Sequence, residues 1–380
     1  MVNSTTWRKE PIHRWYFLTE GLPINLVRNY LRKANGPILD PFVGAGTVLV
    51  EAKLAGIRAV GIDINPFMCF ASSIKTRTYD PDSVLDAVHK VLEEISDHDP
   101  SISPPPIPNL DRYYSPRVLK KLLILKEKIL RLSDIEVRRL LLLAFADIAV
   151  KASNAKKSPA LRFSSIRMDY PVFSKFKKKV RIIVEDLENL TIQETPIDVI
   201  LTDARDLSFL ERKFNLVITS PPYCNNVDFV RHTQLELYWL GLVKSSQDLG
   251  RIRRACITSC EAMAHVNKDC TPIPHLKEVY EIAKLISKNT RRRLPHIVTQ
   301  YFAGMYQHFV NLREVIKCSA KLLYVIGDSW LSGVYIPTHL LLAKLARSAG
   351  FTKCEIRTLR MRNVPRRHRH VIKEYLLIIY

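Results

Sequence analysis

The 380-residue sequence contains no uninterrupted apolar run that approaches the roughly 18 residues of a membrane-spanning helix. The amino-terminal stretch MVNSTTWRKEPIHRWY also lacks the apolar core of a secretory signal. Cysteine is scarce, and its total of 7 is odd, which argues for reduced thiols rather than a disulfide framework. Because 47% of the residues are hydrophobic and 25% are charged, we expect a globular protein. The missing signal core leads us to expect that it is intracellular and cytoplasmic.

A zinc-binding pattern is missing as well. The group that invites a metal site is Cys256, Cys260, His265, Cys270 and His275. Its spacings of three, four, four and four intervening residues match no common zinc motif. We therefore expect no metal, and we favour the alternative that these are separate core and loop residues.

Acidic residues are outnumbered. Lys and Arg total 58 against 37 Asp and Glu, which gives a formal net charge of +21. Phosphate backbones are the commonest partner of such a field, and they make binding strongly salt-dependent. No basic amphipathic helix stands apart from the globular pattern, so a membrane surface is the weaker alternative. The charge thus predicts a nucleic-acid partner.

The first βαβ unit has glycines but lacks two nucleotide fingerprints. A short strand at 38–39 is followed by DPFVGAGT (40–47), a helix that closes at Gly56, and a strand at 59–62 that ends on Asp63. Gly44 and Gly46 allow close approach of a ligand, and the next helix presents free N–H groups. The loop has no third glycine and no Gly-Lys-Ser/Thr, so neither a nicotinamide cofactor nor a P-loop nucleotide is favoured.

Residues 78–196 differ from this pattern. Helices are expected at 83–96, 116–132 and 134–151, with the proline-rich connector SISPPPIPNL between the first two. We interpret the segment as an inserted, mainly helical subdomain that either caps the sheet or holds substrate. Its basic side chains, among them Lys156 and Lys157, favour the second role at least as much as the first.

The centre of the sequence is a strand, FNLVIT (214–219), that runs into Ser220, Pro221, Pro222 and Tyr223. Neither proline can donate a ladder hydrogen bond, so the strand must stop there. The preceding strand, 197–201, ends on Thr202-Asp203-Ala204. Both ends suit a ligand site at the mouth of a parallel sheet.

The remainder of the chain, after residue 223, is expected to complete this sheet. After residue 223 we expect a loop and one helix, then a basic, irregular insertion at 244–300. A helix near 301–317, a strand at 321–326, a helix after Pro337 and two alternating strands around RNVPRRHRH follow. The pattern predicts an α/β fold with a doubly wound, mostly parallel, seven-stranded Rossmann-like sheet and an antiparallel carboxyl-terminal hairpin. Residues 1–77 and 197–380 would form its catalytic domain.

Four motifs in this order, DPFVGAGT (40–47), GIDINP (61–66), TDARDL (202–207) and TSPPY (219–223), resemble the S-adenosylmethionine-dependent amino-methyltransferases. The resemblance is to the branch that methylates the N4 amine of cytosine. It implies that the methionine part of S-adenosyl-L-methionine lies at the glycine loop, the ribose at Asp63 and the adenine amine at Asp203. The full set of implied cofactor residues is Asp40, Phe42, Gly44, Gly46, Thr47, Asp63, Ile64, Asp203 and Ala204.

An aromatic exocyclic amine is a poor nucleophile because its lone pair is shared with the ring. The Ser220 hydroxyl and the Pro221 carbonyl can accept its N–H groups and localise that lone pair, Pro222 rigidifies the carbonyl, and Tyr223 offers a stacking face. In the family, Ser at the first position implies cytosine, whereas Asp or Asn implies adenine. The sequence has no Pro-Cys pair, so methylation at cytosine C5 lacks its usual nucleophile. The base must be flipped out or single-stranded.

The sequence leaves open whether the nucleic-acid substrate is DNA or RNA. Asp228 and Arg231 lie close enough in sequence to line the target pocket or to sit on a helix surface, and Arg366 and Arg367 are candidates for phosphate contact. The resemblance implies DNA, but neither 78–196 nor 244–300 carries a recognisable DNA-reading motif, so structured RNA is the alternative. A further alternative is a nucleic-acid-binding protein that keeps the fold without activity.

Overall fold

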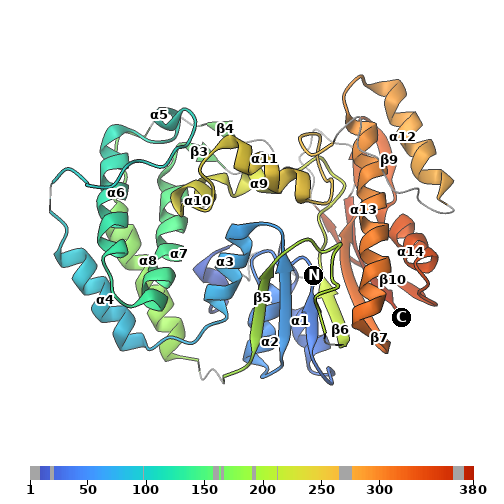
Figure 1. Ribbon diagram of the computed structural model, residues 1–380, viewed down its shortest axis with the longest axis horizontal. Coiled ribbons are helices and arrows are strands. Elements are labelled where there is room, and N and C mark those ends of the chain that lie inside the picture. The colour runs from blue at the N-terminus through green and yellow to red at the C-terminus, as the bar shows by residue number, and fades with distance from the viewer. Residues whose placement is uncertain are drawn as a thin grey trace.

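The computed structural model describes residues 9–17, 21–96, 98–156, 162–163, 167–190, 194–211, 213–264, 276–362 and 372–380. Its centre is a seven-stranded sheet in the order β10-β11-β7-β6-β1-β2-β5. The strands β5, β2, β1, β6 and β7 are parallel, and β11 is antiparallel to β7 and β10 to β11 (Figure 1). The prediction of a mostly parallel sheet with an antiparallel hairpin is confirmed. The bounds are β1 Ile38–Asp40, β2 Ala59–Asp63, β5 Ile197–Leu201, β6 Phe214–Thr219, β7 Ile316–Gly327, β10 Cys354–Arg362 and β11 Ile372–Ile379.

Both faces of the sheet are covered, as alternate strand residues require. Ile38 and Ile218 join one apolar cluster with α1 (Ile24–Leu31) and α2 (Thr47–Leu54). Leu39 and Val217 join another with α12 (Lys277–Asn289), α13 (Leu294–Val315) and α14 (Thr338–Ser348). The strand order departs in opposite directions from β1, with β2 on one side and β6 on the other. Ligands bind at such a switch point, outside the carboxyl ends of the strands.

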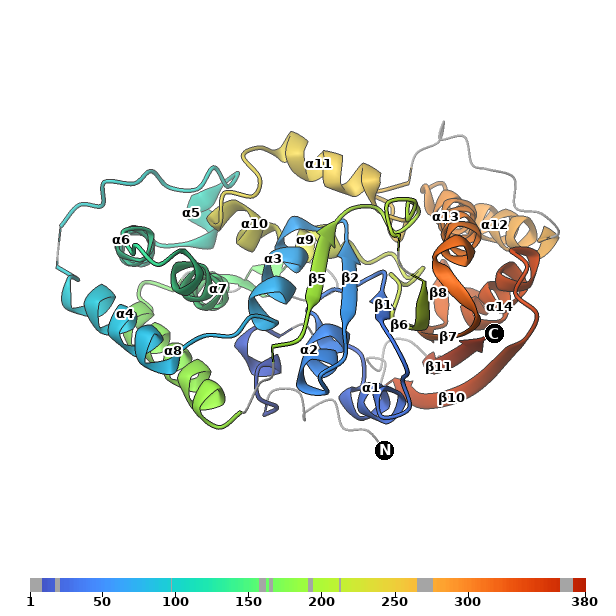
Figure 2. The same cartoon turned by 60° about the horizontal axis from the view of Figure 1, so that its bottom comes forward.

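A helical lobe lies at the β5 edge of the sheet (Figures 1 and 2). It consists of α4 Pro81–Glu93, α5 Leu110–Tyr113, α6 Pro116–Leu130, α7 Ile135–Ala152, the short strands β3 Ala155–Lys156 and β4 Arg162–Phe163, and α8 Val172–Glu188. Most of α7 is buried, and it shares a large apolar cluster with α3 (Pro66–Lys75) and α10 (Gln234–Trp239). The role of this helical lobe as a substrate-binding subdomain stays a prediction.

Several element predictions are wrong. The described part of 244–300 is not irregular, because α11 (Ser246–Ala255) and α12 occupy much of it. The single helix expected after residue 223 is two short ones, α9 (Phe229–His232) and α10. Before α11, Ser245 accepts a hydrogen bond from the Asp248 N–H, a capping signal that the basic composition obscured. The hairpin of β8 (Ser329–Leu331) and β9 (Val334–Ile336) was not expected either. Across the described residues, no helix is long and apolar enough to cross a bilayer.

Candidate active site

One cavity of about 190 Å³ opens at the carboxyl ends of the parallel strands. Four segments far apart in the sequence meet in it: the glycine loop, the end of β2, the loop after β5 and the tetrapeptide after β6. The predicted residues that line it are Phe42, Gly44, Thr47, Asp63, Ile64, Asp203, Ala204, Ser220, Pro221, Pro222 and Tyr223. The structure thus brings eleven of the predicted residues together at the switch point.

The other predicted residues are not among those that line the cavity. Asp40 and Gly46 are sequence neighbours of lining residues of the glycine loop. Asp228 caps α9 through the Arg231 N–H (2.9 Å) and pairs with Arg253 Nε (2.8 Å), while the Arg231 side chain is exposed. This geometry corresponds to the helix-surface alternative for these two residues. Lys156 is exposed on β3, and Lys157, Arg366 and Arg367 lie outside the described residues.

Asp40 ends β1 beneath the cavity and is 1% exposed. Its Oδ1 accepts hydrogen bonds from Thr219 Oγ1 (2.6 Å) and from the Phe42 N–H (3.1 Å). Its Oδ2 has no hydrogen-bond partner among the described residues, although it is buried. Burial raises the pKa of Asp40 to about 7. A buried oxygen without a donor is suited to receive a ligand ammonium group.

The glycine loop needs its glycines for two different reasons. Gly44 has φ +50° and donates its N–H to Asp63 Oδ2 at 2.9 Å. Gly46 has φ +80°, and a Cβ there would lie 2.8 Å from the Cβ of Ser72 on α3. Gly44 therefore shapes the cavity wall, whereas Gly46 permits α3 to pack against the loop.

Asp63 holds the loop and also faces the cavity. Besides Gly44, it accepts a hydrogen bond from the Asn65 N–H at 2.9 Å. Burial raises the pKa of Asp63 to about 6, in opposition to these backbone hydrogen bonds. Asn65 in turn donates from Nδ2 to Thr233 Oγ1 (2.8 Å). This contact connects the wall at β2 to the segment 225–263, which also lines the cavity and is called its roof below.

Two side chains that sequence reasoning missed hold the loop after β5. Arg205 donates from Nε to both oxygens of Asp203 (3.0 Å each) and from Nη2 to the carbonyl of Ala255 in the roof (2.8 Å). The fully buried His308 contacts the carbonyl of Ala204 through Nδ1 (2.7 Å) and the hydroxyl of Tyr324 through Nε2 (2.6 Å).

Burial lowers the pKa of His308 to about 4, so the ring is neutral at pH 7. Its one N–H must then donate to the Ala204 carbonyl, and the hydroxyl of Tyr324 must donate to Nε2. No local pattern in α13 marks this histidine, because its partners lie on other elements.

The tetrapeptide after β6 is held by neighbouring strands. Ser220 Oγ donates to the carbonyl of Val325 (3.1 Å), and the Tyr223 hydroxyl donates to Glu374 Oε1 (3.2 Å). The ring of Tyr223 lies against Gly327, where a Cβ would be 2.8 Å from ring atom Cε2. Glycine at 327 therefore leaves room for the ring beside β7, and Tyr223 is also among the residues that line the cavity.

The roof of the cavity comes from residues 225–263, a segment in which the sequence marked Asp228 and Arg231 as substrate candidates and Cys256 and Cys260 as metal candidates. Its lining residues are Asn225, Phe229, Val230, His232, Thr233, Ala255, Cys256, Ile257, Ser259 and Met263. Neither Cys256 nor Cys260 is in a described cluster of three metal-ligating side chains. The three remaining residues of the metal candidate, 265, 270 and 275, lie outside the described residues.

Comparison with known proteins agrees with this geometry. Residues 18–73, which contain the glycine loop and Asp63, match the family model of N6/N4 methyltransferases, described as DNA methylase. Over this segment the chain is similar to the N6/N4 DNA methylase family. The match covers the glycine loop and the end of β2, and longer similarities extend beyond it.

Three similar proteins align with this chain over most of its length. The type II methyltransferase M.BsoBI of Geobacillus stearothermophilus is 25% identical over 95% of this chain and 83% of its own. M.AvaI of Nostoc sp. strain PCC 7120 is 24% identical over 92% and 81%. M.MvaI of Kocuria varians is 21% identical over 90% and 82%. The chain is thus similar to type II methyltransferases over nearly its whole length.

Proposed function

We propose that this protein transfers a methyl group from S-adenosyl-L-methionine to the N4 amine of cytosine in DNA. The observation that carries the proposal is the single cavity in which the glycine loop, Asp63, Asp203 and residues 220–223 meet. Cofactor groups and target groups must lie within contact distance for direct transfer, and only such a shared cavity allows it.

The residues in and next to the cavity fit this cofactor. The unpaired buried Oδ2 of Asp40 is suited to the ammonium group of the methionine part. The carboxylates of Asp63 and Asp203 are suited to the ribose hydroxyls and the adenine amine. When bound, S-adenosylmethionine supplies an electrophilic methyl group on its sulfonium. The chain then has to place and activate the acceptor nitrogen.

The Ser220 hydroxyl oxygen can act as a hydrogen-bond acceptor for the target amine. Its one hydroxyl hydrogen is directed at the Val325 carbonyl, so its oxygen is left as an acceptor for an N–H of the base. The Pro221 carbonyl is the second proposed acceptor, and Pro222 restricts the backbone that carries it. Two accepted N–H groups would localise the nitrogen lone pair, and Tyr223 would stack on the ring. A serine at this position, rather than Asp or Asn, is what favours cytosine over adenine.

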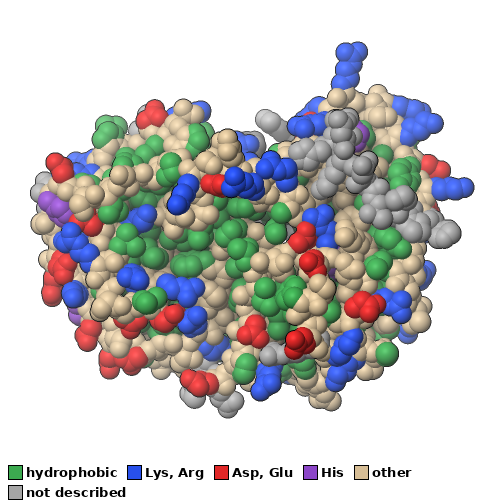
Figure 3. All heavy atoms as spheres, in the orientation of Figure 1, with side chains coloured by type: hydrophobic (Ala, Val, Ile, Leu, Met, Phe, Trp, Pro, Cys, Tyr) green, Lys and Arg blue, Asp and Glu red, His purple; other side chains and the backbone are tan. Residues whose placement is uncertain are grey.

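DNA is the polymer that the similarity to DNA methylases supports. Charge supports a docking face beside the cavity. Helix α11 ends at Ala255, a roof residue, and carries the exposed side chains of Arg251 and Arg254. Lys and Arg side chains gather over α11 in the space-filling view (Figure 3). We propose that this arginine ridge (Arg251, Arg254) contacts DNA phosphates while the flipped base enters the cavity.

Nucleoside mass spectrometry tests the proposal. The purified protein is incubated with deuterated-methyl S-adenosylmethionine and, separately, with double-stranded DNA, single-stranded DNA and each class of RNA. The expected product is labelled N4-methyldeoxycytidine, and it should disappear in Ser220→Ala, which keeps the cofactor residues. Labelled N6-methyladenine would overturn the proposal that cytosine is the target base. Label in RNA alone would overturn the proposal that DNA is the substrate, and the absence of any label would overturn the proposal that the protein is an enzyme.

A further inference from the structure

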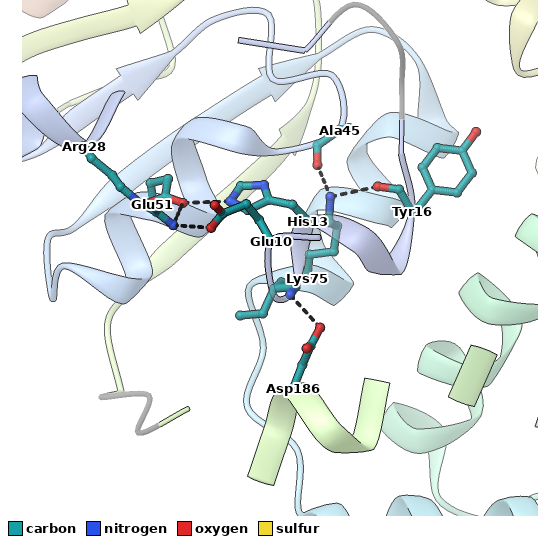
Figure 4. A network of polar contacts seen from close by, with 9 residues as sticks. Glu10, His13, Tyr16, Arg28, Ala45, Glu51, Lys75 and Asp186 are labelled. Atoms are coloured by element: carbon teal, nitrogen blue, oxygen red, sulfur yellow. Dashed lines mark hydrogen bonds and ion pairs between the residues drawn. The ribbon is translucent and has the colours of Figure 1, made fainter. Parts of the chain in front are cut away.

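Lys75, in the last turn of α3, has an ammonium group that the chemistry above does not use. The residue is 1% exposed and is not among the residues that line the cavity. Its Nζ donates to the carbonyl of Ala45 at 2.8 Å and to the carbonyl of Tyr16 at 3.1 Å. Figure 4 shows the Lys75 side chain reaching between these two carbonyls. The lysine therefore connects the glycine loop to the amino-terminal segment.

The peptide unit between Ala45 and Gly46 is held at both ends. Lys75 binds its carbonyl oxygen, and its N–H donates to the carbonyl of Val43 at 2.9 Å. The preceding glycine N–H, that of Gly44, donates to Asp63. Two left-handed glycines make this loop intrinsically permissive, so fixed partners must choose its conformation. Lys75 supplies the side-chain cation among these partners.

The other carbonyl that Lys75 binds belongs to a firmly anchored segment. The N–H of Ile12 and the indole N–H of Trp15 both donate to Asp186 on α8, each at 2.9 Å. The hydroxyl of Tyr16 donates to Glu236 on α10 at 2.5 Å. Residues 12–16 are thus tied to the helical lobe and to a helix within the roof segment.

A second set of contacts connects the same segment to α2, the helix that directly follows the glycine loop. His13 Nε2 lies 2.8 Å from Glu51 Oε1, and Arg28 Nε donates to Glu51 Oε2 at 2.7 Å (Figure 4). Arg28 also binds Glu10 at 2.9 Å. The amino-terminal segment therefore provides a fixed point against which Lys75 can hold the loop.

We infer that Lys75 is a positioning residue for the cofactor: its ammonium group locks the Ala45 carbonyl to the Tyr16 carbonyl and so fixes the glycine loop in its binding conformation. The inference rests on the proposed function. A buried ammonium group between two neutral carbonyls is costly to desolvate, whereas an apolar side chain would fill the same space without that penalty. Burial and the nearby charge of Lys179 lower the pKa of Lys75 to about 7. The Lys75 side chain therefore contributes directed hydrogen bonds to the two carbonyls, which an apolar side chain of the same size would not form.

The chain offers a matched control in Lys53 on α2. Lys53 is 2% exposed, and its Nζ donates to the Thr76 carbonyl at 2.6 Å and to Thr78 Oγ1 at 3.1 Å. Burial lowers its pKa to about 8. It is a second buried lysine bonded to a carbonyl, but these two acceptors belong neither to the glycine loop nor to the cavity lining.

The test compares Lys75→Met with Lys53→Met in the full chain by calorimetric titration with S-adenosylmethionine and by thermal unfolding. We expect Lys75→Met to weaken cofactor binding by about tenfold or more, because small misplacements of binding groups have effects of that size. Turnover at saturating cofactor should stay near that of the wild type. Lys53→Met should lose thermal stability but change the cofactor Kd less than about twofold.

Equal cofactor affinity in Lys75→Met and the wild type would overturn the inference, and so would equal losses in the two methionine variants. If Lys75→Met does not fold, Lys75→Gln, which keeps an N–H donor without the charge, takes its place, and the same two results would overturn the inference. Failure of the wild-type protein to bind the cofactor would instead overturn the proposed function, and this inference with it.

Discussion

The hydroxyl group of Tyr223 donates a hydrogen bond of 3.2 Å to Glu374, a residue 151 positions further along the chain. Glu374 is 1% exposed on β11 and also forms an ion pair with Arg360 on β10. The antiparallel hairpin, which carries no recognised motif, therefore fixes the ring on which the target base would stack. A ring held at its hydroxyl and against Gly327 loses little freedom when a base arrives.

Tyr223→Phe and Tyr223→Ala separate anchoring from stacking. The phenylalanine variant loses the hydrogen bond to Glu374 and keeps the ring, so we expect kcat/KM for the nucleic acid to fall by about fivefold, or about 1 kcal/mol. The alanine variant also loses the stacking face, worth about a further 1–3 kcal/mol. Steady-state kinetics with each variant give the two values, and the cofactor Kd should be unchanged in both. An alanine variant as active as the phenylalanine variant would contradict the stacking role.

Asp40→Asn should stabilise the cofactor-free protein and weaken cofactor binding. Burial raises the pKa of Asp40 from 3.8 to about 7, so the folded state holds a proton that the unfolded chain releases between these values. Stability due to this group is therefore full below pH 3.8 and is lost as pH rises through 7. At pH 8 the asparagine variant should be more stable by up to about 4 kcal/mol.

Chemical denaturation at pH 8 and calorimetric titration measure the two effects. We expect the cofactor Kd of Asp40→Asn to rise by about tenfold or more, because a hydrogen bond to a charged group is worth about 1.5–3 kcal/mol. A variant that gains stability and keeps wild-type affinity would show that Asp40 does not receive the ammonium group.

Gly46→Ala should destabilise the protein through packing on α3. A Cβ at this position would lie 2.8 Å from Ser72, in addition to the strain of φ +80°. Gly333 is a matched control, since it also has φ +80° but a Cβ added there would meet nothing within 4 Å. We expect Gly333→Ala to lose about 1–2 kcal/mol from backbone strain alone, and Gly46→Ala to lose more and to bind the cofactor less tightly. Denaturant titration compares them, and equal losses would refute the packing role.

The arginine ridge should set part of the salt dependence of DNA binding. Replacing Arg251 and Arg254 by Gln should lower the slope of log K against log salt by about 2, if each contacts one phosphate. The control is Arg32→Gln with Lys33→Gln, an exposed pair just before β1, at the opposite end of the strands from the cavity. Binding measured across a salt series gives both slopes. A ridge variant with the same slope as the control pair would exclude this face.

The meeting of the glycine loop and the end of β2 at one cavity could be predicted because its signals are local. Gly44, Gly46 and Asp63 lie within one βαβ unit, where each glycine and each strand end has a direct conformational meaning. The two prolines after β6 stop a strand whatever surrounds them. The helix at α11 was missed for the opposite reason, since its arginine-rich sequence resembles a solvated loop and its capping residues are polar.

Backbone sterics and period-2 burial act between neighbouring residues, so the ends of the strands, and the acids, glycines and prolines at those ends, follow from local sequence. The contacts of Thr219 with Asp40, of His308 with Ala204 and of Glu374 with Tyr223 follow instead from how whole elements pack. These partners are 179, 104 and 151 positions apart. A contact across such separations is selected by the packing of whole elements, so it leaves no periodicity or spacing in the sequence.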